Sequence, residues 1–349
     1  MRERPKPEQT AVIGDIVDER IVMGHGAGGR KMHRLIRNVF VRRFGSKPLR
    51  RLEDGAVLES LRGRLVMSTD SYVIQPLFFP GGDIGKLAVC GTANDLAVMG
   101  AEPRFLSVGF VIREGLDTAL LDRVARSIAR TCRANGVEVV TGDTKVIERG
   151  GDDGLYINTT GIGVRSTRAK MGAEFIRAGD AVMINGAIGE HEAAIAVARG
   201  AYRFKGKVRS DCAALVGLIR PLLDIPGLRI LRDPTRGGLA TTLNEFCDAS
   251  ELGIIIEEDA LFIPAPVRGV ARLLGLDPLY MANEGKVTIV AAEKSSAGIV
   301  ARMRRHRLGR HAARIGTVVS SPKGVWLKTR LGSLRPLIML EGEQLPRIC

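Results

Sequence analysis

Hydrophobic and polar residues follow two regular spacings along most of the chain, and each spacing predicts one type of element. In the first half, alternation predicts strands over 65–70, 105–112, 137–141 and 155–164. Apolar residues at helical spacing predict helices over 84–100 and 117–135. The succession of strands and amphipathic helices indicates an α/β (α+β) half, in which several strands end near polar clusters.

A similar rhythm returns after the turn Arg177-Ala178-Gly179-Asp180. The helices predicted in this second half cover 192–199, 211–223, 239–249, 267–274 and 295–305. The predicted strands cover 181–185, 254–257, 287–292, 313–319 and 325–328. A chain of 349 residues is long enough for two domains of ordinary size, so we expect one domain from each half.

These patterns divide the chain into four parts. Residues 1–48 are polar and basic and are predicted to form an N-terminal arm with a glycine-rich loop. Residues 49–170 and 171–335 are the two predicted domains. Residues 336–349 are predicted to be a flexible tail, because 340–344 is polar and shows neither helical nor strand periodicity.

Composition and charge favour some classes of protein over others. The chain has no uninterrupted apolar stretch of membrane-spanning length and no apolar signal region at its start. We therefore expect a cytoplasmic protein that does not associate with a membrane. The formal net charge is +14, with basic residues densest over 302–310. Aromatic residues make up only 4% and no stacking motif accompanies the basic ones, so a solvated helix end is favoured over nucleic-acid binding. An anionic substrate or an acidic protein partner also suits this charge.

The five cysteines are scattered, odd in number and free of any Cys-x-x-Cys pair, which argues against a disulfide framework or a zinc site. Cys90, Cys132, Cys212 and Cys247 lie in apolar helical context and are expected in the core. Cys349 is the last residue. On a mobile tail its thiolate could carry a covalent group between sites, although this residue alone favours a dispensable end.

Acidic residues recur in Gly- and Thr-rich segments that are predicted as turns. They are Asp70, Asp83, Asp95, Asp143 and Asp233. Carboxylates are hard ligands that suit Mg²⁺ bridging to phosphates. Glycine-flanked amides, and helix starts such as those near Lys86 and after Gly237 and Gly238, suit phosphate oxygens. Neither a P-loop nor a strand-linked Gly-x-Gly-x-x-Gly is present, so we predict a nucleotide site built from several loops.

Lys145 and Glu284 are each open to more than one interpretation. Lys145 follows Asp143 by two residues, so both side chains face the same way on an extended segment. Such a lysine could neutralise a phosphoryl group, transfer a proton, or form a structural ion pair. Glu284 lies between apolar segments, before Gly285, and could be a turn acid or a buried base.

The histidines are equally ambiguous. His25, with Gly28 and Gly29, could form a loop that covers phosphates or a flexible linker. His191 lies between Glu190 and Glu192. Consecutive residues do not share a helix face, so we expect a solvated helix start there rather than a metal site.

Several of these motifs together resemble the HypE family, the carbamoyl dehydratases of nickel–iron hydrogenase maturation. The likeness covers about 22–349, and its most specific parts are Gly142-Asp143-Thr144-Lys145-Val146 and the terminal Pro346-Arg347-Ile348-Cys349. The other matching segments begin at His25, Ser68, Phe78, Gly91, Arg232 and Ala282. HypE belongs to the superfamily of aminoimidazole ribonucleotide synthetase and selenophosphate synthetase.

This resemblance implies a two-domain fold of the aminoimidazole ribonucleotide synthetase type, a homodimer formed through the N-terminal domain, and ATP with Mg²⁺ near the dimer and domain interfaces. It implies the HypF carbamoyltransferase as donor and the HypC–HypD complex as cyanide acceptor. The implied reaction is the ATP-dependent dehydration of an S-carbamoyl group on Cys349 to a thiocyanate, with Lys145 and Glu284 as proton-transfer candidates. Asp70, Asp95, Asp143 and Asp233 are the implied metal ligands.

Two points qualify the resemblance. Relatives usually have Gly-Asp-His-Gly where this chain has Gly189-Glu190-His191-Glu192, which raises a question about the backbone of that loop. A kinase or synthetase acting on a free small molecule is the alternative within the superfamily. The selenophosphate synthetase branch is disfavoured, because no cysteine precedes Cys90.

Overall fold

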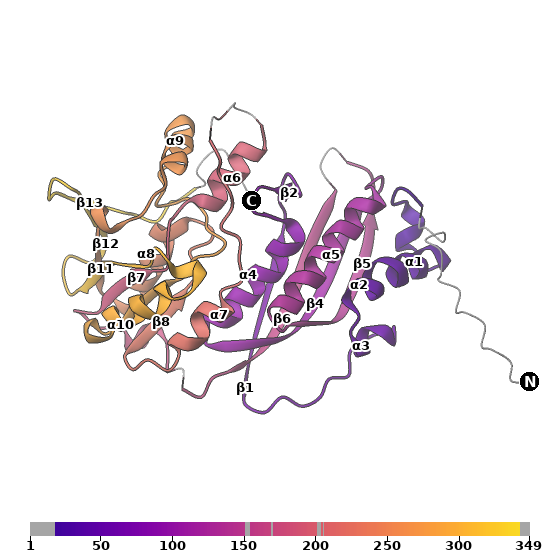
Figure 1. The fold of residues 1–349 in the computed structure, drawn as a ribbon, viewed down its shortest axis with the longest axis horizontal. Coiled ribbons are helices and arrows are strands. Elements are labelled where there is room, and N and C mark those ends of the chain that lie inside the picture. Colours follow the sequence, from indigo (N-terminus) through magenta and orange to yellow (C-terminus); the bar gives the residue numbers. More distant parts are fainter. Residues whose placement is uncertain (1–17, 151–153, 169, 201–203, 205, 343–349) are drawn as a thin grey trace, which may run out of the picture.

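Each half of the chain forms one sheet with helices packed on it, and the two halves lie side by side (Figure 1). The structure, a computed structural model, describes residues 18–342 except 151–153, 169, 201–203 and 205. The predicted α/β class is confirmed. The domain limits predicted above remain predictions.

The first half contains a four-stranded sheet in the order β1-β6-β4-β5. Its strands are β1 (Arg64–Tyr72), β4 (Ala101–Arg113), β5 (Glu138–Ile147) and β6 (Leu155–Arg165). Helices α4 (Ile84–Val98) and α5 (Thr118–Ala134) cover one face (Figure 1). The other face is open, and hydrophobic side chains such as Leu65, Met67 and Val111 are exposed on it. A short hairpin of β2 (Phe78–Phe79) and β3 (Gly82–Asp83) precedes α4.

Helix α4 is buried on nearly all sides because it lies between the two halves. Leu87 and Ala88 belong to the core of the first half, whereas Ala97 and Val98 pack with residues of the second half. The helix also contacts both α7 (Val216–Ile219) and β8 (Leu228–Arg232). Polar side chains of α4, such as Asn94 and Asp95, are therefore placed at the junction of the two halves.

The N-terminal segment is more ordered than its polar composition predicts. It contains the short 3-10 helix η1 (Met23–Gly26), followed by the helical segments α1 (Arg30–Leu35), η2 (Ile36–Val41), α2 (Arg42–Phe44) and α3 (Lys47–Arg50). Leu35, Val39 and Phe40 join the first core, and the ring of Phe40 stacks on that of Phe110 with centroids 4.4 Å apart. The described part of the predicted arm thus packs on the first half, at the β5 end (Figure 1).

The second half contains a seven-stranded sheet in the order β13-β12-β9-β11-β7-β10-β8. Its other strands are β7 (Ala181–Ile184), β9 (Gly253–Glu257), β10 (Thr288–Ala291), β11 (Ala313–Val319), β12 (Gly324–Lys328) and β13 (Leu334–Pro336). Its other helices are α6 (Glu190–Ala198), α8 (Gly238–Ser250), α9 (Ala265–Leu274) and α10 (Glu293–Arg304). Both faces of β7 are covered, since Val182 and Ile184 pack in the core that holds α8, and Ala181 and Met183 in the core that holds α10.

Two predicted elements differ from the structure. The segment 211–223 is helical only over α7 and a 3-10 turn at Arg220–Leu222. A helix over 211–215 is prevented because Asn94 binds the backbone of Ala213 and Leu215. Asp143 was predicted in a turn but lies within β5, where Gly142 permits close contact: a Cβ there would be 2.4 Å from the carbonyl oxygen of Val108.

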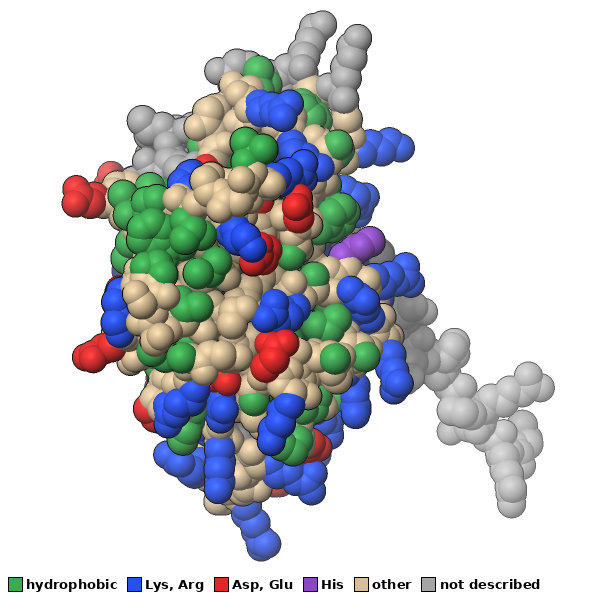
Figure 2. Space-filling view, turned by 90° about the vertical axis from the view of Figure 1, so that its left-hand side faces the viewer, with side chains coloured by type: hydrophobic (Ala, Val, Ile, Leu, Met, Phe, Trp, Pro, Cys, Tyr) green, Lys and Arg blue, Asp and Glu red, His purple; other side chains and the backbone are tan. Residues whose placement is uncertain are grey.

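The surface of the second half mixes all types of side chain. Figure 2 shows lysine and arginine side chains spread over this face, with acidic and hydrophobic ones between them. Cys90, Cys132, Cys212 and Cys247 are all buried, as predicted, although Cys212 lies outside any helix. Within the described ranges, no helix has both the length and the apolar character needed to span a membrane.

Candidate active site

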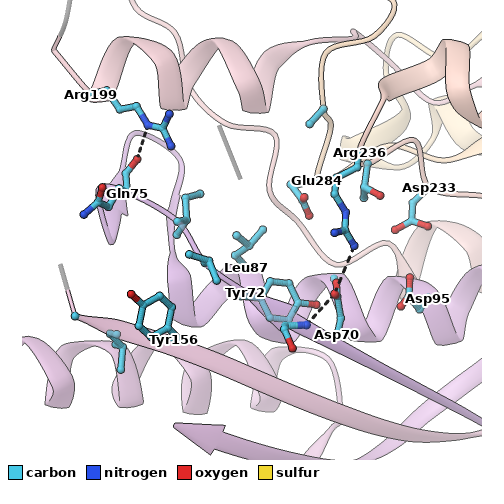
Figure 3. Close-up of a pocket in the computed structure, with 18 residues that line it drawn as sticks. Asp70, Tyr72, Gln75, Leu87, Asp95, Tyr156, Arg199, Asp233, Arg236 and Glu284 are labelled. Carbon is cyan, nitrogen blue, oxygen red and sulfur yellow. Dashed lines mark hydrogen bonds and ion pairs between the residues drawn. The ribbon is translucent and has the colours of Figure 1, made fainter. Parts of the chain in front are cut away.

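A cavity of about 540 Å³ opens where the two halves meet. Side chains from β1 and α4 form one wall, and the opposite wall comes from the segment after β8 and the turn before β10. Figure 3 shows Asp70, Asp95, Asp233 and Glu284 gathered toward one end of this pocket. We call these four residues the acidic end.

The four carboxyl groups come from separate elements. Asp70 lies in β1 and Asp95 in α4, where the Oδ2 of Asp95 accepts a hydrogen bond of 2.6 Å from the Ser68 hydroxyl. Asp233 follows β8, and Glu284 lies in the turn before β10. Arg236 reaches in from the segment after β8, with 4.0 Å between its Nη2 and the Oδ1 of Asp70 (Figure 3).

Burial and mutual repulsion make the acidic end unfavourable for several negative charges at once. Burial, followed by the charge of the neighbouring Asp95, raises the pKa of Asp233 to about 7. Burial likewise raises the pKa of Asp95, and the charge of Asp70 adds to this shift. The pKa of Glu284 lies well above its ordinary value, first because of burial and then because of Asp211 and Asp233. A bound cation would relieve this repulsion.

The acidic end fits a metal ion that is shared with a ligand. No group of three or more metal-binding side chains converges closely enough to hold an ion among the residues that the structure describes. Mg²⁺ is usually bound through one or two carboxylates together with waters and substrate phosphates. Asp70, Asp95 and Asp233 could therefore supply protein ligands to an ion whose other ligands come from a phosphorylated substrate.

The opposite end of the pocket is less acidic. Gln75, Tyr156 and Arg199 lie there, and the Nε of Arg199 donates to the Gln75 carbonyl over 3.1 Å (Figure 3). Tyr72 and Leu87 line the wall between the two ends. The Tyr72 ring packs closely on α4, because a Cβ on Gly91 would be only 2.3 Å from the Tyr72 hydroxyl.

Asp83 and Lys86 lie outside the residues that line the pocket. The Oδ1 of Asp83 accepts from the Lys86 N–H at the start of α4, and its Oδ2 accepts from the Ser127 hydroxyl. The Nζ of Lys86 donates to the carbonyl of Gly81 over 2.8 Å. Both residues thus secure the corner between β3 and α4, and their predicted contact with a nucleotide remains a prediction.

Asp143 and Lys145 lie far from the acidic end within this chain. They are exposed on the open face of β5, while Thr144 and Val146 between and beside them point to the core. Strands β1 and β5 are the two edges of the sheet, three strand spacings or about 14 Å apart. Within one chain, therefore, the five predicted acids do not form a single cluster.

The glycine-rich loop lies with Asp143 rather than with the acidic end. A Cβ on Gly26 would be 2.8 Å from the Val146 nitrogen, so the loop packs directly on β5. His25 is buried, and its Nδ1 accepts from the Val22 N–H over 3.0 Å. Gly28 and Gly29 follow in open space at the start of α1.

Gly237 and Gly238 come directly after Thr235 and Arg236, which line the pocket, and lead into α8. Both have left-handed backbones, with φ of +73° and +60°. A Cβ on Gly238 would also be 2.6 Å from the Met281 carbonyl oxygen. This position brings the start of α8 close to the turn that carries Glu284.

The prediction of a solvated helix start at 190–192 is wrong. His191 is fully buried, and its Nδ1 lies 2.8 Å from the Ser210 hydroxyl. Glu192 is buried as well, and its Oε2 accepts from the Ala282 N–H over 2.7 Å. Residue 192 lies within α6, where the helical backbone does not require a glycine.

Sequence reasoning missed the residues that support Glu284 from behind, namely Asp211 and Lys286. Asp211 was assigned to a helix, and only its contacts across the fold reveal its role. Cys349 lies outside the described residues, as does the rest of 343–349.

Comparison with known proteins gives consistent matches over nearly the whole chain. Residues 52–165 match the AIR synthase related protein, N-terminal domain, family and residues 177–327 match the corresponding C-terminal domain family. "Carbamoyl dehydratase HypE" of Cupriavidus necator is 47% identical over 338 residues, 96% of each protein.

Two solved structures extend this result. The hydrogenase maturation protein HypE in complex with ATP is 46% identical with a TM-score of 0.89, over 94% of this chain and 99% of that one. HypE in a HypE–HypF complex is 41% identical with a TM-score of 0.77, over 88% and 99%. The two-domain fold predicted from the sequence is thereby confirmed.

Proposed function

This chain belongs to the HypE family of AIR synthase related proteins, and we propose that it is an ATP-dependent carbamoyl dehydratase acting on its own C-terminal cysteine. It converts an S-carbamoyl group on Cys349 into a thiocyanate, which supplies the cyanide ligand of a nickel–iron hydrogenase. The observation that carries the proposal is the acidic end of the pocket, which includes Glu284, in a chain that also carries the segment Pro346-Arg347-Ile348-Cys349.

The reaction requires the amide oxygen to become a leaving group. The γ-phosphoryl group of ATP is transferred to the carbamoyl oxygen, and its bond to the β-phosphate breaks to release ADP. The two N–H protons are then removed, and the C–O bond breaks to release phosphate and leave S–C≡N. Asp70, Asp95 and Asp233 would hold Mg²⁺, which when bound would neutralise negative charge on the phosphates. Glu284 removes a proton, and its raised pKa makes it a stronger base than an ordinary carboxylate.

The tail makes the substrate intramolecular, since Cys349 is tethered to the protein that holds ATP. Tethering raises the effective concentration of the reacting group and removes the need to bind it from solution. The family relationship further suggests HypF as the carbamoyl donor, because a HypE relative has been crystallised with HypF. The HypC–HypD complex as acceptor and a cytoplasmic location complete the proposal.

A homodimer would bring Asp143 and Lys145 to the pocket. These residues lie on the open face of the sheet, which also exposes Leu65, Met67 and Val111, as expected of a face that a second subunit covers. We therefore place Asp143, Lys145 and the glycine-rich loop of one subunit at the acidic end of the other. Lys145 then neutralises the transferred phosphoryl group or relays a proton from the carbamoyl nitrogen.

Mixed dimers test this arrangement. A Lys145→Ala subunit paired with a Glu284→Gln subunit keeps one intact site if the two residues act across the interface, so about half of the activity should return. The matched control pairs a wild-type subunit with a Lys145→Ala/Glu284→Gln subunit and should then be inactive. The reverse result, an active control and an inactive first pair, would place both residues in one subunit.

The intact mass of the protein, which reports the group carried by Cys349, tests the chemistry itself. With carbamoyl phosphate, HypF and ATP, the wild-type protein should show the thiocyanate mass. Glu284→Gln should accept the carbamoyl group but keep the carbamoylated mass in the presence of ATP. Lys145→Ala should do the same if Lys145 relays the proton, but should mainly weaken ATP binding if it only neutralises phosphate. Normal thiocyanate formation by Glu284→Gln would remove Glu284 from the mechanism.

A further inference from the structure

A buried carboxylate behind the pocket, that of Asp211, clamps the turn that carries Glu284. Its Oδ1 accepts from the Glu284 N–H and its Oδ2 from the Gly285 N–H, both over 3.1 Å. Gly285 allows this approach, because a Cβ there would be 2.0 Å from the Asp211 carbonyl oxygen. The backbone position of Glu284 is thus defined by its contact with Asp211.

Asp211 is held in the charged form that makes it a good acceptor. Its side chain is only 3% exposed and pairs with the Nζ of Lys286 at 2.9 Å, and Lys286 also binds Glu190 at 3.0 Å. Burial is the largest single influence on the pKa of Asp211 and would raise it, but the charge and hydrogen bond of Lys286, together with His191 and the Glu284 N–H, bring the pKa below its ordinary value. The carboxylate therefore offers acceptors to all three donors around it.

The segment 210–215, which carries Asp211, is hydrogen-bonded to the first half of the protein. The Ser210 N–H donates to the Pro80 carbonyl over 2.7 Å. The Asn94 side chain binds the Ala213 carbonyl and the Leu215 N–H. Because Asn94 directly precedes Asp95 in α4, this segment connects the helix that carries a proposed metal ligand with the turn that carries the proposed base.

We propose that Asp211 is a positioning residue that sets the place of Glu284 relative to the three aspartates of the acidic end. The inference rests on the proposed function, in which Glu284 removes a proton from the carbamoyl nitrogen. A base must come within hydrogen-bonding distance of the proton that it removes. Displacement by about 1 Å can lower a rate by about 100-fold even when the substituted residue is distant from the reacting atoms.

Asp211→Asn tests this role with little change in shape. The asparagine NH₂ group cannot accept from Gly285 or Lys286, so one of the two amide bonds is lost. The rate of thiocyanate formation should fall about 10- to 100-fold. The KM for ATP and the carbamoylation of Cys349 should stay near wild-type values, because Asp211 contacts neither. A purely structural role would not separate kcat from KM in this way.

Asp180→Asn is the matched control. Asp180 is also a buried carboxylate of the second half, and it accepts from the Arg177 N–H and the Arg229 Nε, away from the pocket. Its replacement removes a comparable buried ion pair and should leave the dehydration rate close to that of the wild-type protein.

Amide hydrogen exchange gives a measurement that is independent of catalysis. Peptides containing the amides of Glu284 and Gly285 should exchange faster in Asp211→Asn and remain protected in Asp180→Asn. The double variant Asp211→Asn/Lys286→Met removes the whole buried pair, which proteins often tolerate, and should dehydrate as slowly as Asp211→Asn. The double variant therefore replaces Asp211→Asn in the rate measurement if the single variant does not fold.

Three outcomes would overturn the inference. They are a wild-type dehydration rate with unchanged protection of these amides, an equal loss of rate in Asp180→Asn, or a raised KM for ATP in place of a lowered kcat. If Glu284→Gln dehydrates normally, the proposed base is wrong, while the exchange measurement still decides whether Asp211 holds the turn.

Discussion

Burial of His191 predicts a specific loss of stability in mild acid. The imidazole is fully buried, stacks edge-on against Phe79, and has no partner for its Nε2 among the described residues. Burial lowers its pKa from 6.5 to about 4, although the nearby charge of Asp211 acts in the opposite direction. The folded state therefore excludes a proton that the unfolded state takes up.

The size of the effect follows from these two pKa values. Because the folded pKa is the lower one, stability is present above the unfolded pKa and is lost as pH falls from about 6.5 toward 4. Between pH 7 and pH 5, this single group should reduce the free energy of unfolding by about 2 kcal/mol. His191→Gln cannot titrate, so its free energy of unfolding should fall by about 2 kcal/mol less over the same range.

Urea titrations at a series of pH values can measure this difference. Trp326 is the only tryptophan and lies in β12, so its fluorescence follows unfolding of the half that contains His191. Exposed His33 provides His33→Gln as the control for removing an imidazole from the surface. Parallel pH dependence for the wild-type protein and His191→Gln would refute the argument, because it would mean that the imidazole has the same pKa in the folded and unfolded states.

Further predictions concern the pocket and the tail. Cys349→Ala should abolish the thiocyanate mass while ATP binding, measured by calorimetry, is retained, since the thiol carries the substrate rather than the nucleotide. Asp95→Asn and Asp143→Asn should each lower Mg²⁺-dependent ATP hydrolysis at least tenfold by removing a metal ligand, and normal turnover in both would contradict the assignment. Gly91→Ala should weaken ATP binding several-fold because its Cβ displaces Tyr72 toward the pocket, and unchanged affinity would show that the ring moves elsewhere.

Most elements of the fold could be predicted from the sequence, because hydrophobic periodicity is a local property of each segment. The pattern placed α4, α5 and β11 within a few residues of their observed limits. It failed at 211–223, where Asn94 binds the Ala213 carbonyl and the Leu215 N–H, and the Glu284 carbonyl accepts from the Ala213 N–H. Those partners lie about 70 to 120 residues away in the chain, so no local pattern could indicate them.

The candidate site divides in the same way. Asp70, Asp95, Asp233 and Glu284 were chosen from local motifs, and the structure places them around one pocket. The sequence could not show that Asp143 and Lys145 lie on the opposite face of the sheet, because strand order is set by pairing between distant segments.

His191 and Asp211 illustrate the remaining limit. The sequence predicts a solvated helix start at His191 and a helix that begins at Asp211, yet the structure buries both side chains. Motifs determine which chemical groups are present, since each motif is a short run of the chain. Only tertiary packing decides which of those groups lose water and acquire partners, because burial depends on the whole fold around them.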